Sequence, residues 1–178
     1  MGQGDGTFEL RSYASGLDLR GGWGAAWADV DLDGDPDLMT SAGLYINEHS
    51  AEDKGHWLQI RPVGNVISNR AALGATVEIT VGDETRIRHI TGGTAQGCQD
   101  AQVAHFGLGD DDEISGIQVM YPGGDTVVYE GPFAADQRIK VFEDGGVGAP
   151  ATPAPEDETP DDDASDDETP NPDAGGAE

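Results

Sequence analysis

Apolar and polar residues alternate along the middle of the chain, as they do in half-buried β-strands. The clearest alternating run covers residues 76–81, and a second run over 85–90 follows the pair Gly82-Asp83. Two such runs joined by a glycine-containing turn predict a β-hairpin. Further short apolar runs of the same kind cover residues 57–61, 103–106, 114–121, 126–129 and 138–142.

The runs are separated by turn residues and show no helical period, so they predict an all-β fold. One of the separators, Pro122-Gly123-Gly124-Asp125, has the composition of a tight turn. We expect residues 56–143 to form one small β-sandwich or barrel, because roughly 90 residues are enough for a core of this kind.

Composition changes on both sides of this middle region. Residues 1–50 are rich in Gly, Asp and Trp, and we expect them to form a separate small module. Residues 145–178 contain no Lys, Arg or aromatic residue and consist largely of Pro, Gly, Ala, Asp and Glu. Such a segment cannot bury enough apolar surface to fold, so it predicts a disordered acidic tail. The tail would act as a spacer or as a solubilising segment.

The charge of the chain excludes two classes of partner. The 178 residues carry 35 Asp+Glu against 9 Lys+Arg, a formal net charge of −26. Such a surface repels nucleic acid and anionic lipid, and we expect no membrane insertion because no apolar run is long enough to span a bilayer. In molar salt the Debye length is about 3 Å, so the charges of the chain repel one another only over that short distance. The charge therefore predicts a halophilic protein, with an acidic secreted calcium-binding protein as the alternative.

One acidic stretch, WADVDLDGDPDLM over residues 27–39, differs from the tail because its acids alternate with apolar residues. Carboxylates at positions 1, 3 and 5 followed by glycine at position 6 are typical of a calcium loop. An EF-hand would place Glu at position 12, where this chain has Thr40, so we expect a shorter loop between two strands. The predicted ligands are the side chains of Asp29, Asp31, Asp33 and Asp37 and the backbone carbonyl of Asp35.

The alternative for this stretch is a solvated acidic loop without a metal. Two observations favour the metal. Five carboxylates within nine residues would repel one another without a cation, and hard oxygen ligands favour Ca²⁺. The apolar residues around the acids are expected to be buried: Trp23, Trp27, Val30, Leu32 and Leu38.

We expect no enzymatic activity, since no serine lies in a Gly-x-Ser-x-Gly motif and no nucleotide-binding glycine motif is present. Cys98 is the only cysteine. It is either a small apolar side chain or, less simply, one half of a thiol pair with His89 or His105. The acidic turn 110–113 is a candidate for a second calcium site. Four arginines either form a small patch for an acidic sugar or carboxylate, or face solvent and pair with acids: Arg61, Arg70, Arg86 and Arg88.

Two parts of the chain resemble known families. Residues 23–38 resemble an FG-GAP/VCBS repeat, which is one blade of an integrin-type β-propeller with a DxDxDGxxD calcium loop. Residues 56–143 resemble an ASPIC and UnbV domain in HWLQI at 56–60, HFGLG at 105–109 and VMYPGG at 119–124. In this order, the two modules resemble the C-terminal end of proteins of the cartilage acidic protein 1-like family.

The resemblance implies a non-enzymatic, calcium-binding module for binding or adhesion to a protein or glycan. It also implies an extracellular or cell-surface location, although the first residues, MGQGDGTFEL, have no signal-peptide pattern. The alternatives are an accessory domain of an exported enzyme, such as a carbohydrate-binding domain, and a truncated structural remnant. Propellers need about four to eight blades. We therefore expect the single blade either to join blades of a longer or separate chain or to dock on the neighbouring β-domain.

Overall fold

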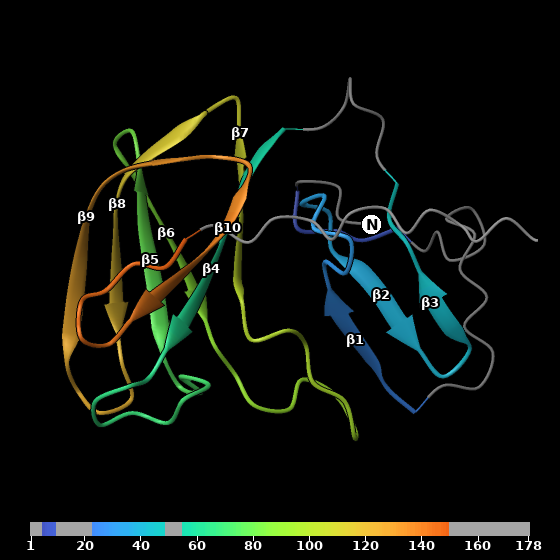
Figure 1. The fold of residues 1–178 in the computed structure, drawn as a ribbon. Coiled ribbons are helices and arrows are strands. Elements are labelled where there is room, and N and C mark those ends of the chain that lie inside the picture. The colour runs from blue at the N-terminus through green and yellow to red at the C-terminus, as the bar shows by residue number, and fades with distance from the viewer. Residues whose placement is uncertain (1–4, 10–22, 49–54, 150–178) are drawn as a thin grey trace, which may run out of the picture.

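The computed structural model describes residues 5–9, 23–48 and 55–149, and its fold is all-β, as predicted. The described strands form three sheets (Figure 1). The N-terminal sheet has the order β1-β2-β3 and comprises β1 (Ala25–Ala28), β2 (Asp37–Thr40) and β3 (Gly43–Tyr45). None of the described segments is a helix that could span a membrane.

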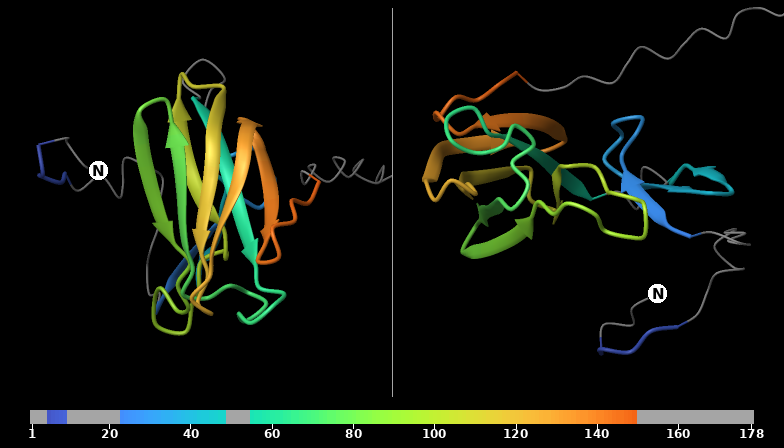
Figure 2. Two further views of the ribbon diagram at one scale, coloured as in Figure 1. Left: turned by 90° about the vertical axis from the view of Figure 1, so that its left-hand side faces the viewer. Right: turned by 90° about the horizontal axis from the view of Figure 1, so that it is seen from below.

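The other two sheets form a β-sandwich, one of the two predicted architectures. The three-stranded sandwich sheet has the order β10-β4-β7 and comprises β10 (Gln137–Phe142), β4 (His56–Val63) and β7 (Ala104–Gly109). The four-stranded sandwich sheet has the order β6-β5-β8-β9 and comprises β6 (Glu84–His89), β5 (Thr76–Val81), β8 (Glu113–Met120) and β9 (Thr126–Ala134). The two sheets remain separate layers (Figure 2).

The core of the sandwich lies between these sheets and uses the alternation seen in the sequence. In β5 the side chains of Val77, Ile79 and Val81 are buried, and the intervening residues face outward. Leu58 of β4 and Phe106 of β7 meet them from the other sheet as members of the same apolar cluster. Burying apolar side chains from both layers is the main source of stability in such a fold.

The predicted hairpin and turn are both present. β5 pairs with β6 in antiparallel register from Thr76 opposite His89 to Val81 opposite Glu84, and Gly82-Asp83 forms the turn. The tight turn between β8 and β9 is closed by two hydrogen bonds. The Tyr121 N–H donates to the Asp125 carbonyl at 2.8 Å, and the Gly124 N–H donates to the Tyr121 carbonyl at 2.9 Å.

Two strands extend beyond the runs that predicted them. β7 continues to Gly109 and β9 continues to Ala134, through Gly131 and Pro132. Gly131 lies against β8, where a Cβ would come within 2.4 Å of the Ser115 carbonyl oxygen. A side chain is excluded at this close approach, so the apolar alternation is interrupted at Gly131 and resumes at Phe133, which packs against the core.

The N-terminal sheet lies beside the sandwich, on the side of β4, β7 and β10 (Figure 1). Its β1–β2 loop packs on Trp57 of β4. At Gly34, a Cβ would come within 2.1 Å of the Trp57 indole nitrogen, so only glycine fits this contact. Both faces of β4 are therefore covered: Leu58 is buried in the core, and Gln59 is buried on the opposite face. The N-terminal sheet is therefore docked on the β-domain, and its joining to further blades stays a prediction.

The burial expected for the residues around the acidic stretch is only partly observed. Leu38 is buried and Leu32 is half-buried, but Trp23 is 80% exposed, Trp27 48% and Val30 51%. The prediction was wrong for these three side chains. The physical reason is that three short strands form a single layer, and no second described layer covers this side of the sheet.

Candidate metal centre

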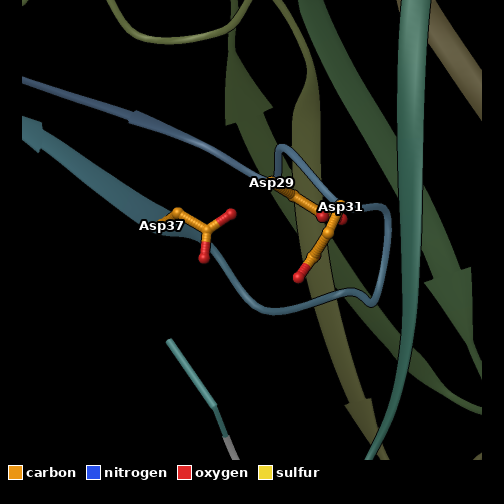
Figure 3. Close-up of side chains that lie close together, drawn as sticks. All are labelled: Asp29, Asp31 and Asp37. Atoms are coloured by element: carbon orange, nitrogen blue, oxygen red, sulfur yellow. The ribbon is translucent and has the colours of Figure 1, made fainter. Parts of the chain in front are cut away.

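The β1–β2 loop brings three of the predicted carboxylates together. Asp29 follows β1, Asp37 begins β2 and Asp31 lies between them in the loop (Figure 3). One carboxylate oxygen from each residue lies within 4.8 Å of the other two. Asp29 and Asp37 are buried, whereas Asp31 is exposed, so the cluster opens to solvent on one side.

Local hydrogen bonds shape the loop. Asp31 Oδ1 accepts the Asp33 N–H at 3.2 Å, and Asp33 Oδ1 accepts the Asp35 N–H at 2.8 Å. These are side-chain-to-backbone turns of the kind that Asp favours. Leu32 and Gly34 adopt the left-handed conformation, with φ of 64° and 99°. The alternating aspartates therefore have a second role beyond charge, because they fold the loop that carries them.

Asp37 ties the two ends of the loop to the sheet. Its Oδ2 accepts the Val30 N–H at 2.8 Å, and its Oδ1 accepts the Asn47 N–H at 2.9 Å. Two backbone donors hold this buried carboxylate in one orientation. A carboxylate fixed in this way pays little further entropy when it binds a ligand.

Side chains of the sandwich help to hold Asp29 in place. Its Oδ2 accepts the Gly34 N–H at 3.1 Å and a hydrogen bond from the Gln59 side-chain amide. The Arg138 guanidinium donates from Nη2 to the Asp29 carbonyl at 3.0 Å, and the same Nη2 lies 3.7 Å from Oδ2. The other carboxylate oxygen, Oδ1, is buried and has no hydrogen-bond partner among the described residues.

The unpartnered Asp29 oxygen indicates whether a cation fits among these residues. A buried carboxylate oxygen without a partner is costly, and Asp29 belongs to the cluster with Asp31 and Asp37. Burial raises the pKa of Asp31. The negative charges of Asp33, Asp37 and Asp29 raise it further, against the lowering effect of the Asp33 N–H. A cation would satisfy the oxygen and remove the repulsion, so the donor set fits a hard metal ion.

The structure differs in detail from the predicted ligand set. Asp33 lies in the loop but is not part of the three-carboxylate cluster, and the predicted role of the Asp35 backbone carbonyl stays a prediction. Two residues that hold Asp29, Gln59 and Arg138, were not predicted. They lie 30 and 109 positions away in the sequence. Nothing in the local pattern of β4 or β10 marks them, because they look like ordinary outward-facing strand residues.

Among the remaining predicted candidates, Arg86, Arg88 and Cys98 have structural contacts. Arg86 Nη1 donates to the Gly107 carbonyl at 2.7 Å, and Arg88 Nε donates to the His105 carbonyl at 3.1 Å, so both arginines bridge the edge between the two sandwich sheets. Cys98 is half-buried, and a Cβ at Gly24 would come within 2.6 Å of its sulfur. Within the described ranges, the acidic turn 110–113 forms no cluster of metal-binding groups.

Comparison with known proteins supports the resemblance of the β-domain. Residues 65–147 match the family described as ASPIC and UnbV. Over 132 residues, 70% of this chain, the sequence is 33% identical to "Cartilage acidic protein 1" of Homo sapiens, covering 20% of that protein. Over 110 residues, 58% of this chain, it is 36% identical to "Cartilage acidic protein 1" of Xenopus tropicalis, covering 16% of that protein.

The chain thus spans one fifth or less of the length of these relatives. The ASPIC and UnbV assignment and the similarity to cartilage acidic protein 1 are confirmed. The FG-GAP/VCBS repeat in residues 23–38 stays a prediction.

Proposed function

We propose that this chain is a calcium-binding module of an extracellular or cell-surface protein and that it has no catalytic activity of its own. Asp29 carries the proposal, because it belongs to a cluster with Asp31 and Asp37 and its buried Oδ1 has no partner among the described residues. The similarity to cartilage acidic protein 1 supports an extracellular setting. In this proposal the ion supplies positive charge that holds the β1–β2 loop closed against the sandwich.

The chemistry of the cluster favours calcium over softer metals. The cluster consists of carboxylate oxygens, and Ca²⁺ takes six to eight oxygen ligands in flexible geometry. Three carboxylates leave room for backbone carbonyls, including that of Asp35, and for water. Gln59 and Arg138 act on Asp29 from outside the cluster. They orient its carboxylate and partly offset its charge before any ion binds.

Binding to a protein or glycan partner is supported by the surface of the N-terminal sheet. Met39 of β2 and Leu44 of β3 lie opposite each other in the register and are both exposed, on the face of the sheet opposite to Trp27. Adjacent exposed large apolar side chains on one face of a small sheet are typical of an interaction surface. Further blades of a longer or separate chain would cover the same surface, so both kinds of partner are consistent with it.

Calorimetric titration of the full chain with Ca²⁺ tests the metal site. We expect one site, and we expect Asp31→Asn to weaken it by about tenfold or more, because affinity in such loops follows the number of ligand charges. Asp31 is exposed, so its substitution should leave the fold intact. The matched control is Asp83→Asn in the β5–β6 turn, which removes the same charge far from the loop. Equal binding in Asp31→Asn and the wild type, or equal loss in both variants, would contradict the proposal.

A further inference from the structure

Three polar side chains form a row across the outer face of the three-stranded sandwich sheet. Arg138 of β10 is paired with Gln59 of β4, and Gln59 is paired with His105 of β7. Their sequence neighbours on each strand point into the core. A row of one guanidinium, one amide and one imidazole is unusual on a face that another sheet covers, because buried polar groups are costly unless they are used.

This row lines a pocket of about 200 Å³ between the sandwich and the N-terminal sheet. The opposite wall contains Trp27 and Pro36. Val103 adds an apolar side chain, and Arg88 reaches the pocket from β6. The pocket is therefore built from three sheets, and it combines an aromatic wall with a cationic one.

Both arginines of the pocket are anchored and retain free donors. Arg138 uses Nε on the Gln59 side-chain oxygen at 2.6 Å and Nη2 on Asp29. Arg88 uses Nε on the His105 carbonyl and Nη1 on the Ile87 carbonyl at 2.9 Å, and its guanidinium lies 5.3 Å from the centre of the Phe106 ring. Within the described part of the chain, Nη1 of Arg138 and Nη2 of Arg88 have no hydrogen-bond partner.

The imidazole of His105 adds a third unused group. Its Nδ1 is buried and has no partner among the described residues. Each acid that lines the same pocket is engaged through one oxygen: Asp100 Oδ1 accepts the Trp27 N–H at 2.9 Å, and Asp29 Oδ2 accepts the Gly34 N–H and the Gln59 amide, whereas Asp29 Oδ1 has no partner among the described residues. The donors of Arg88 and Arg138 that remain free favour a ligand that carries an anionic group.

We propose that this pocket binds a small carboxylic acid with a ring-shaped body, of the chemical class of a uronic acid. Guanidinium groups recognise carboxylates by paired, charge-assisted hydrogen bonds. The exposed indole of Trp27 offers an apolar face for a ring. The volume is below the roughly 300–1,000 Å³ of sites for drug-sized molecules, so it suits about one sugar ring. The site needs no metal ion, because the guanidinium groups of Arg88 and Arg138, which lie on sandwich strands, supply its positive charge.

Nuclear magnetic resonance titration of the ¹⁵N-labelled full chain with glucuronate tests this proposal. We expect saturable shifts at residues 27–29 and 101–105, and we expect Arg88→Gln to weaken binding by about tenfold. Arg86→Gln is the matched control, because Arg86 lies on the same strand and also donates to a β7 carbonyl but does not line the pocket. Wild-type affinity in Arg88→Gln, or the same loss in Arg86→Gln, would overturn the proposal.

Two further ligands test separately what the carboxylate and the ring contribute to binding. Acetate keeps the carboxylate without the ring, and glucose keeps the ring without the charge. We expect glucuronate to bind more tightly than either ligand. Equal binding of glucose and glucuronate, or no binding of glucuronate to protein whose spectrum shows a folded sandwich, would overturn the proposal. Calcium titration of the same sample reports on the candidate metal centre, which shares Asp29 with this pocket, so the two titrations are scored separately.

Discussion

Replacing Gly34 with alanine tests how the candidate metal loop is attached to the sandwich. Gly34 has φ of 99° and lies on the indole of Trp57, where an added Cβ would come within 2.1 Å of Nε1 and 2.2 Å of Cε2. Its N–H also donates to Asp29 Oδ2. Alanine therefore faces two separate obstacles, an unfavourable backbone conformation and a steric overlap, and both act on the residue that holds Asp29.

The two costs can be estimated separately. A left-handed backbone conformation costs a residue with a Cβ about 1–2 kcal/mol. Overpacking against a side chain that cannot move freely costs a further 1–3 kcal/mol, approximately. Trp57 is buried, so the indole has little room to withdraw. We expect Gly34→Ala to lower the free energy of unfolding by about 2–5 kcal/mol, or to lift the loop from Trp57 at a similar cost.

Gly82→Ala is the matched control. Gly82 also has a positive φ, 54°, but nothing lies within 4 Å of its added Cβ. This variant has the backbone cost alone, so we expect a loss of about 1–2 kcal/mol. Urea denaturation measures both losses, and calcium titration measures the loop. If Gly34→Ala matches Gly82→Ala in stability and binds calcium as the wild type does, the loop does not pack on Trp57 as described, and the reasoning fails.

Three further predictions concern the sandwich and the charge. Tyr121→Phe should destabilise the protein by about 1–3 kcal/mol in urea denaturation, because the buried Tyr121 hydroxyl lies 3.0 Å from the Val141 carbonyl and 2.9 Å from the Tyr129 hydroxyl; an unchanged midpoint would contradict this. Burial would raise the pKa of Glu143, but hydrogen bonds from the Ser68 hydroxyl and from the Val66, Ser68 and Ile67 N–H groups outweigh it and hold the pKa at about 2. The Glu143 contribution to stability is therefore present above its ordinary pKa of 4.5 and is lost as the pH falls through about 2, so wild-type protein should lose more stability than Glu143→Gln over that range, and parallel stability–pH curves would refute the assignment. The net charge of −26 predicts a melting temperature that rises from low to molar NaCl, and a flat response would exclude the halophilic interpretation.

The sequence by itself determined the strands, the β5–β6 hairpin and the turn before β9. These features depend on neighbours in the chain: alternation sets which side chains share a face, and Gly82 or Gly124 supplies a turn conformation. The acidic loop was visible for the same reason, since Asp29, Asp31 and Asp37 lie within nine residues of one another. Local spacing was enough to predict a metal site, because the predicted ligands also form the turns that fold the loop.

Only the tertiary structure decided which of these aspartates face a common point and what holds them there. Gln59 and Arg138 reach Asp29 from strands that are distant in the sequence, and Gly34 meets Trp57 only because the two modules dock. The same docking buries Gln59 and creates the pocket beside His105. It also leaves Trp27 half exposed, although a large aromatic side chain favours burial. Burial and charge pairing depend on contacts between sheets. The residue pattern of a single strand does not show which other surface will pack against that strand.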